Sequence, residues 1–490
     1  MTYTYLSLAE KKALLEERLR RKLAVAPIVS SSCSFSEELL WLIHQLNPNS
    51  NAYNQQMVVL LTGKLNFLAL EQTLNALLDR HHPLRDTFRF ESDKLVRYTQ
   101  NTNLVLPVIS VDELVKTDIM EEIENKTLEI ITRCLEEPFD LENGPVFRAK
   151  LLRLNGLTHI LLVELHHIVV DVQSFGVMIK EFSLFYNSFA KSEKPSLKNL
   201  PTEYKDIANK QRQKTSIKDL EKSLSYWENK LTSSTFNLSL PTDYQRPRNQ
   251  NFIGARRTIT IPDNIVESFS KFSRTYGVTT FAIMLTALKI LLFKWTQQKD
   301  IVIGTVNANR TSSEVESLIG CFINFIPLRS IFSPEMLAIE SLKQVRETIF
   351  ESFANQNVPF QKIIERVNPT RKTNSNPLYN VGFLMQNFNL QIDGLYFAPI
   401  SVSTLKQALH TDIKDAVLEN GLKARFVPMD PEASLLDLRF IAAPISKLIT
   451  CEYDRNLFNA ETIDLLLANY CEILTQLLSS PEKPLSSFRL

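Results

Sequence analysis

The chain has 490 residues, of which 44% are hydrophobic and 22% are charged, and this length and composition predict a globular protein of two to four domains. Its 55 lysines and arginines nearly balance 54 aspartates and glutamates. The chain therefore lacks the excess positive charge with which proteins bind nucleic acid or an anionic membrane. The five cysteines lack CxxC spacing, which argues against a disulfide framework and a structural zinc site and favours a cytoplasmic location.

The first predicted element is an amphipathic helix at residues 7–24, where leucines form one stripe between charges of both signs. Its mixed charge is unlike a signal peptide. Two interpretations of residues 1–30 stay open: a linker helix ahead of a domain, or a solvated helix without a role. The most apolar later segment, "FAIMLTALKILLFKW" at 281–295, is short and holds two lysines, so no membrane span is expected.

Helical and strand patterns alternate along the rest of the chain and predict an α+β fold. Residues 31–200 are assigned to an N-terminal lobe and residues 201–490 to a C-terminal lobe, because a polar stretch at about 191–222 separates two similar mixtures of elements. The clearest patterns of the first lobe are a helix at 65–81 and strands at 56–63, 146–154 and 159–165.

The stretch "LHHIVVDVQS" at residues 165–174 follows an apolar strand and precedes a helix for which Ser174 is the expected N-cap. Side chains alternate along a strand, so His166 and His167 are expected to point to opposite faces. An imidazole titrates near neutral pH, and Asp171 has the chemistry to organise the loop. The pattern therefore allows general-base or oxyanion-stabilising work by one histidine.

The same stretch has other interpretations. Adjacent histidines converge poorly on one ion and no third ligand is suitably spaced, so a metal site is not expected. A buried, hydrogen-bonded histidine pair at a strand end remains the structural alternative. A serine-type triad finds no support, because the chain has no GxSxG elbow.

Ten segments taken in order resemble the condensation domains of nonribosomal peptide synthetases, and the resemblance covers roughly residues 30–480. The segments are "SFSEELLWLIHQLNPNSNAYN" (34–54), "RHHPLRDTF" (80–88), "PFDLENGPVFRAKL" (138–151), "LHHIVVDVQS" (165–174), "YKDIANKQ" (204–211), "LPTDYQRPR" (240–248), "IGTVNANR" (303–310), "IGCFINFIPLR" (319–329), "NQNVPFQKIIERV" (355–367) and "NPLYNVGFLMQNF" (376–388).

This resemblance implies two chloramphenicol-acetyltransferase-like lobes in a V-shaped pseudo-dimer around a central tunnel. It implies that an acyl, peptidyl or polyketide thioester on one carrier domain reacts with the amine of an aminoacyl thioester on a second carrier, so that an amide forms. The phosphopantetheine arms belong to the carriers, and the resemblance implies no cofactor or metal on this chain. The resemblance also implies that an adenylation domain follows in an assembly line and that the chain is an enzyme of the transferase or ligase type.

The resemblance also implies residue roles. His167 matches the family's key histidine, which either deprotonates the amine or positions it and stabilises the tetrahedral intermediate. His166 and Asp171 match the structural members of the motif. A buried carboxylate requires a cation, so Arg310 is the candidate partner of Asp171, with Arg80 and Arg85 as alternatives.

The chain departs from the family's HHxxxDG pattern at Val172, which stands where glycine is expected. Glycine there indicates a positive φ or a close approach of backbone to ligand. Three interpretations stay open: an active branch with a large apolar residue here and a retained Ser174, an ordinary peptide-forming domain that tolerates valine, or a domain with altered chemistry or a recruiting role. Heterocyclisation is disfavoured, because cyclising relatives carry aspartate at the two histidine positions. Val172, Ser174 and Asn324 are the candidate tunnel or substrate residues.

Two rival functions also follow. One is an acyltransferase of the same superfamily that uses coenzyme A, and the other is a noncatalytic platform that recruits enzymes to a loaded carrier. No adenylation signature or carrier-type serine motif appears in the sequence, so the partners expected are donor and acceptor carrier domains, with neither nucleic acid nor membrane.

Overall fold

The computed structural model describes residues 29–115, 120–214, 217–248, 251–310, 312–369, 376–386, 405, 415–429 and 433–490. The helix predicted at 7–24 lies outside these residues. The described chain divides into two compact units. Unit 1 comprises residues 1–213, 308–322 and 389–431, and unit 2 comprises residues 214–307, 323–388 and 432–490.

This division differs from the contiguous lobes expected at 31–200 and 201–490. The chain changes unit after residue 213, and the described residues of the segments 308–322 and 389–431 belong to unit 1 although parts of unit 2 precede them in sequence. The physical reason is pairing: strand β13 (Lys423–Met429) bonds along β2 (Asn54–Thr62) in the sheet of unit 1. A domain boundary placed at the polar stretch does not show that later segments of the chain belong to unit 1.

Unit 1 is built on a six-stranded sheet in the order β12-β13-β2-β7-β6-β5, in which only β5 and β6 run parallel. A three-stranded sheet in the order β1-β4-β3 belongs to the same unit. The strands not yet given are β1 (Val29–Ser32), β3 (Asp86–Glu91), β4 (Lys94–Thr99), β5 (Val108–Ser110), β6 (Phe147–Arg153), β7 (Thr158–His166) and β12 (Ala416–Val417). The α-helices are α2 (Phe35–Leu46), α3 (Phe67–Arg80), α4 (Val111–Val115), α5 (Met120–Glu136), α6 (Val172–Ala190) and α7 (Tyr204–Lys214).

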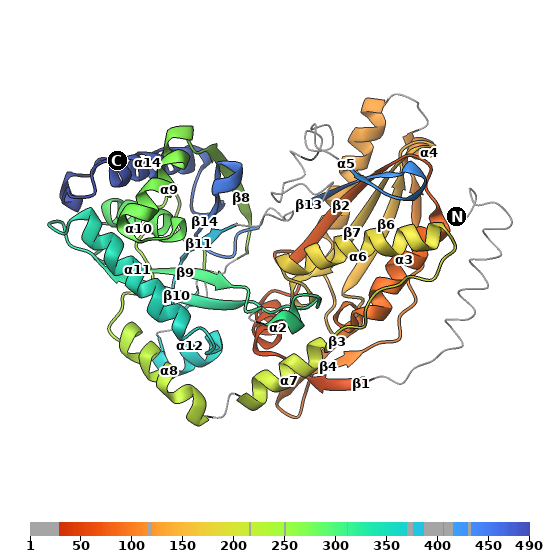
Figure 1. The fold of residues 1–490 in the computed structure, drawn as a ribbon, viewed down its shortest axis with the longest axis horizontal. Coiled ribbons are helices and arrows are strands. Elements are labelled where there is room, and N and C mark those ends of the chain that lie inside the picture. The colour runs from red at the N-terminus through yellow and green to blue at the C-terminus, as the bar shows by residue number, and fades with distance from the viewer. Residues whose placement is uncertain are drawn as a thin grey trace. The chain divides into compact units, whose positions relative to one another are not determined.

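Both faces of the larger sheet of unit 1 are covered by helices. One core joins α3 and α6 to the residues of β2 and β7 that point to that face, and Figure 1 shows these two helices along the same face of the strands. The other core joins α5 to the alternate residues of β2, β7 and β13. Strand β7 is therefore buried along nearly its whole length, which explains its continuous apolar run.

Unit 2 contains a second six-stranded sheet, in the order β10-β9-β11-β14-β15-β8, in which β11 runs parallel to both of its neighbours. Its strands are β8 (Gly254–Thr260), β9 (Asp300–Asn307), β10 (Asn324–Ile331), β11 (Val381–Met385), β14 (Leu438–Ala443) and β15 (Leu448–Asp454). Its α-helices are α8 (Ile217–Leu231), α9 (Asp263–Tyr276), α10 (Thr280–Thr296), α11 (Ala338–Ala354), α12 (Phe360–Val367) and α14 (Ala460–Ser479). The expected α+β class is confirmed in both units.

The central helix α10 carries the segment that is most apolar by sequence, and it is buried nearly all round. Its single fully buried lysine, Lys289, donates to the carbonyl of Leu328 at 2.7 Å and to the hydroxyl of Ser330 at 2.9 Å. Within the described ranges no single helix has the length and hydropathy of a membrane span. Helices α9 and α10 meet these criteria only as a pair, with a bend of 102° between them.

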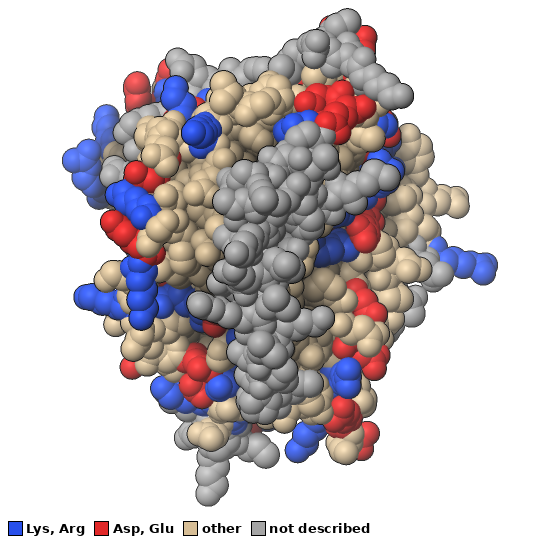
Figure 2. Space-filling view, turned by 90° about the vertical axis from the view of Figure 1, so that its right-hand side faces the viewer, with Lys and Arg blue, Asp and Glu red and all other residues tan. Residues whose placement is uncertain are grey.

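Charged side chains of both signs are interspersed on the face of the molecule drawn in Figure 2, in keeping with the near balance of 55 basic and 54 acidic residues.

Candidate active site

The histidine pair lies where β7 ends in unit 1. His166 is the last residue of β7, and His167 opens a short 3-10 helix, η2 (His167–Val169). The backbone N–H of His167 donates to the carbonyl of Tyr53 at 2.8 Å. Ile168, Val169 and Val170 are fully buried, so three apolar side chains anchor the loop between the strand and α6.

His166 is a structural histidine in this arrangement. Its ring is 1% exposed, and its Nδ1 accepts the N–H of Ile168 at 3.1 Å. Burial lowers its pKa well below the usual value, and the neighbouring charges of His44 and His167 lower it further. His166 therefore stays neutral near pH 7, and its accepting Nδ1 holds the turn of the loop.

His167 has the opposite environment. Its side chain is only partly buried, and its Nδ1 lies 2.7 Å from the carbonyl oxygen of Val170. A carbonyl oxygen can only accept, so in the neutral ring Nδ1 carries the proton and Nε2 carries the lone pair. That tautomer is the one in which Nε2 can take a proton from a substrate.

Asp171 and Arg310 form a two-pronged ion pair inside unit 1. Arg310 Nη2 lies 2.9 Å from Asp171 Oδ1, and Nε lies 3.3 Å from Oδ2. The side chains are 3% and 2% exposed. Paired donors and acceptors of this kind are strong and fix orientation.

The same guanidinium holds the loop that carries it. Arg310 Nη1 donates to the carbonyls of Val315 at 2.6 Å and Leu318 at 2.9 Å, and the Phe322 ring lies 4.2 Å from the guanidinium carbon. The alternative arginines have other partners: Arg80 pairs with Glu181, and Arg85 donates to the carbonyls of Leu78 and Gln100.

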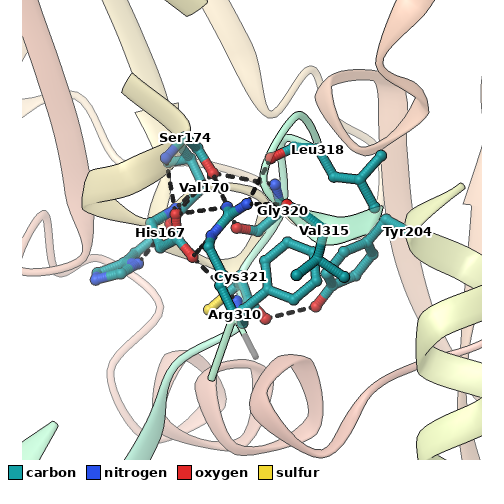
Figure 3. A network of polar contacts seen from close by, with 11 residues as sticks. His167, Val170, Ser174, Tyr204, Arg310, Val315, Leu318, Gly320 and Cys321 are labelled. Atoms are coloured by element: carbon teal, nitrogen blue, oxygen red, sulfur yellow. Dashed lines mark hydrogen bonds and ion pairs between the residues drawn. The ribbon is translucent and has the colours of Figure 1, made fainter. Parts of the chain in front are cut away.

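Asp171, rather than Ser174, is the N-cap of α6, so the cap predicted from the sequence is wrong. Asp171 Oδ1 accepts the N–H of Ser174 at 2.8 Å, and Ser174 is the third residue of the helix. The helix starts earlier than expected because the aspartate satisfies its first free N–H groups. Ser174 Oγ instead contacts Asp171, Arg310 and the backbone of Gly320 (Figure 3).

Val172 is the first residue of α6 and has no positive φ. The backbone therefore does not require the family's glycine at this position. The Val172 side chain is 46% exposed. The difference between valine and glycine is one of exposed side-chain volume beside the histidine loop, without backbone strain.

Asn324, the third candidate for substrate contact, opens β10 in unit 2. Its amide donates to the carbonyls of Gln356 and Val358, both at 2.8 Å, and accepts the N–H of Phe360 at 3.1 Å. These bonds tie β10 to the start of α12. A substrate contact by Asn324 stays a prediction.

Three contributors to the site were missed by sequence reasoning: the carbonyl of Val170, the backbone of Gly320 and the hydroxyl of Tyr204. Tyr204 Oη donates to the carbonyl of Cys321 at 2.6 Å. Figure 3 shows Tyr204 at one end of the polar network and the His167 ring at the other. The sequence signal that could have identified Tyr204 was its place at the start of the segment "YKDIANKQ".

A buried charge cluster adjoins Tyr204 on its other side. Arg97 lies 3.2 Å from Glu37 and 3.6 Å from Asp86, and all three are at most 1% exposed. A small pocket beside the cluster is lined in part by Asp86, Arg97 and Tyr204. Two carboxylates thus share one guanidinium in a poorly hydrated place.

We expect Asp86 to give the folding stability a pH dependence. Burial raises its pKa from 3.8 to about 7, although Arg97 and a hydrogen bond from Thr99 oppose the rise. Because the pKa is higher in the folded state, the stabilisation is complete below about pH 4 and is lost as pH rises through about 7. Asp86→Asn should remove this loss, measured by urea unfolding at pH 4 to 8.

Asp140 supplies the opposite control. Hydrogen bonds from Asn143 lower its pKa, so its contribution is present at higher pH and is lost on acidification. Asp140→Asn should therefore weaken the protein more at pH 6 than at pH 3. If the unfolding free energies of wild type and Asp86→Asn changed equally with pH, Asp86 would not be the source of the pH dependence.

Among the residues that the structure describes, no group of three or more His, Cys, Asp or Glu side chains is placed to hold a metal ion. The chemistry that the described side chains offer at the site is that of an oriented imidazole beside a buried ion pair.

A protein-family model and several curated proteins match this chain. The family model described as "Condensation domain" matches residues 33–490. A linear gramicidin synthase of Brevibacillus parabrevis is 32% identical over 466 residues, which cover 93% of this chain and 8% of that protein. Malpinin synthetase of Mortierella alpina is 33% identical over 407 residues, which cover 80% of this chain and 5% of that protein. The chain thus spans a small fraction of the length of such relatives.

Solved structures share the fold at lower identity. The X-domain from teicoplanin biosynthesis superposes with a TM-score of 0.80 at 21% identity and covers 95% of this chain and 99% of that one. A four-domain nonribosomal peptide synthetase bound to AMP and glycine gives a TM-score of 0.79 at 19% identity, over 95% of this chain and 34% of that one.

Proposed function

The chain belongs to the condensation-domain family, whose members form amide bonds between carrier-bound substrates in nonribosomal peptide synthesis, and we propose that His167 is the group that takes the proton from the attacking amine. The resemblance drawn from ten ordered segments is confirmed by the family match. The observation that supports the role of His167 is the 2.7 Å contact from its Nδ1 to the Val170 carbonyl, since it leaves the ring lone pair on Nε2.

The proposed reaction joins two thioester-bound substrates. The amine nitrogen of the acceptor attacks the carbonyl carbon of the donor thioester, so a C–N bond forms and the C–S bond breaks. The nitrogen loses its proton to Nε2 of His167, and this proton passes on to the departing phosphopantetheine thiolate, so the imidazole becomes neutral again. Such proton transfer contributes about 10²- to 10⁴-fold to rate. Holding two tethered reactants together can contribute more.

We assign supporting roles to the remaining residues. Asp171 and Arg310 fix the start of α6 and hence the Val170 carbonyl, and His166 holds the loop from its buried side. The phosphopantetheine arms belong to carrier domains, which are the proposed donor and acceptor partners. An adenylation domain that follows in the same assembly line is part of this proposal.

The test is reconstitution with separate carriers. Purified protein is mixed with an acyl-loaded donor carrier and an aminoacyl-loaded acceptor carrier, and mass spectrometry of the acceptor detects the amide. The donor panel includes peptidyl and polyketide acyl groups. Product from acyl-coenzyme A without a donor carrier would support the rival acyltransferase. Carrier binding without product across the panel would support a recruiting domain.

Val172→Gly is expected to change donor selection without unfolding the protein. Residue 172 already has a helical backbone at the exposed start of α6, so glycine should cost less than about 1 kcal/mol. Removing the exposed valine should lower the KM for bulky donors relative to small ones. The KM for the aminoacyl acceptor serves as the internal control. Unchanged ratios across the donor panel would show that Val172 does not contact the donor.

A further inference from the structure

Tyr204 opens α7 and is buried against the segment 320–322 of unit 1. Its hydroxyl donates to the carbonyl of Cys321 at 2.6 Å and lies 3.0 Å from Ser34 Oγ. Burial raises the pKa of Tyr204 well above its usual value, so the hydroxyl keeps its proton. The donor to Cys321 is therefore present near neutral pH.

The ring of Tyr204 is held as firmly as its hydroxyl. Phe322 meets it edge to face, with ring centroids 4.9 Å apart at 86°, and the Arg97 guanidinium lies 5.1 Å from the ring centroid. A Cβ on Gly320 would lie 2.2 Å from the ring, so only glycine allows this approach. These contacts fix the position of the Tyr204 ring and of the backbone at residues 320–322.

The segment that Tyr204 supports is the one that contacts Asp171. The N–H of Phe322 donates to Asp171 Oδ2 at 3.3 Å. The N–H of Gly320 donates to Ser174 Oγ at 3.2 Å, and that hydroxyl lies 2.8 Å from Asp171 Oδ1. Displacement of this segment would loosen the carboxylate that caps α6.

Asp171 directly follows Val170, whose carbonyl accepts from Nδ1 of His167 at 2.7 Å. A shift of the cap therefore moves the carbonyl that selects the His167 tautomer. Because the neutral imidazole has two tautomers, weakening this bond would allow the one with the proton on Nε2. In that tautomer Nε2 cannot accept a proton.

We propose that Tyr204 is a positioning residue for the amide-forming reaction: through its bond to Cys321 and its packing on Gly320 and Phe322, it holds Asp171 and Val170 so that the lone pair of His167 stays on Nε2. This inference rests on the proposed function of His167. Tyr204 acts through other residues and is not assigned a contact with substrate.

The experiment combines kinetics with nitrogen NMR of the full chain. Tyr204→Phe keeps the ring and removes one hydrogen bond. We expect kcat to fall about tenfold, with KM for either loaded carrier changed less than about twofold. With ¹⁵N-histidine labelling, the Nδ1 and Nε2 shifts of His167, assigned with His167→Gln among the seven histidines, should move toward the other tautomer.

Tyr470→Phe is the matched control. The Tyr470 hydroxyl is also buried and donates to a backbone carbonyl, that of Met284, at 2.9 Å in unit 2. We expect a comparable loss of stability with unchanged kcat and unchanged His167 shifts. Equal kinetic losses in both variants, or unchanged His167 shifts in a folded Tyr204→Phe, would overturn the proposal.

Two further arms keep the test decisive. Should Tyr204→Phe fail to fold, Phe322→Leu, an apolar exchange that cores tolerate, perturbs the same segment, and unchanged His167 shifts in it would equally overturn the proposal. The NMR shifts need no turnover. If His167 proves dispensable for product, the function proposed for it fails, while the tautomer shift still reports whether Tyr204 positions the ring.

Discussion

We expect His167→Ala to lower the rate of amide formation by about 10²- to 10⁴-fold, the range for loss of a general base. The imidazole is only partly buried, so its removal leaves no large cavity, and the lost bond to the Val170 carbonyl should cost about 1 kcal/mol of unfolding free energy. The rate is measured by single-turnover mass spectrometry of the acceptor carrier, with both carriers fully loaded. Under these conditions the loss should appear in the single-turnover rate constant.

His82→Ala is the matched control for this variant. His82 lies in unit 1, and its side chain is 35% exposed and pairs with Glu203 at 3.3 Å. The same chemical change there should leave the rate within about twofold, since surface pairs contribute little. A His167→Ala rate close to that of His82→Ala would show that the imidazole does not take part in the reaction.

Arg310→Met is expected to cost about 3–5 kcal/mol of unfolding free energy, because it leaves the Asp171 carboxylate buried without its cation. The variant also removes the donors to Val315 and Leu318. The rate of amide formation should fall at least tenfold even at temperatures where the variant remains folded. The reason is that Asp171, which caps α6 directly after Val170, loses its main partner. Urea unfolding and single-turnover rates are measured on the same preparation.

Arg329 in unit 2 provides a close control. It pairs with Asp300 through Nε at 2.9 Å and Nη2 at 3.0 Å and donates to the carbonyls of Lys230 and Thr232. Arg329→Met should also destabilise the protein, but less, because Asp300 is 17% exposed, while the rate of the folded protein stays near wild type. Equal effects of the two variants on the rate would indicate that Arg310 serves stability alone.

Much of the fold was predictable because the signals are local. The continuous apolar run of β7 follows from burial on both faces. The helical spacing of apolar residues in α3 and α6 follows from packing one apolar stripe against the sheet. These patterns depend on neighbours within one element. The boundary of α6 was less predictable, since either Asp171 or Ser174 has the chemistry of an N-cap and only the backbone conformation decides between them.

The candidate site divides in the same way. Residue types and their order were enough to identify the histidine loop, the family and the aspartate that needs a cation. They left three arginines as partners for that aspartate. Only the tertiary structure selected Arg310, 139 residues away, gave His167 a tautomer through the Val170 carbonyl, and placed Tyr204 against Gly320. Those choices depend on contacts between distant segments and on backbone atoms, and backbone carbonyls and N–H groups are the same in every residue except proline.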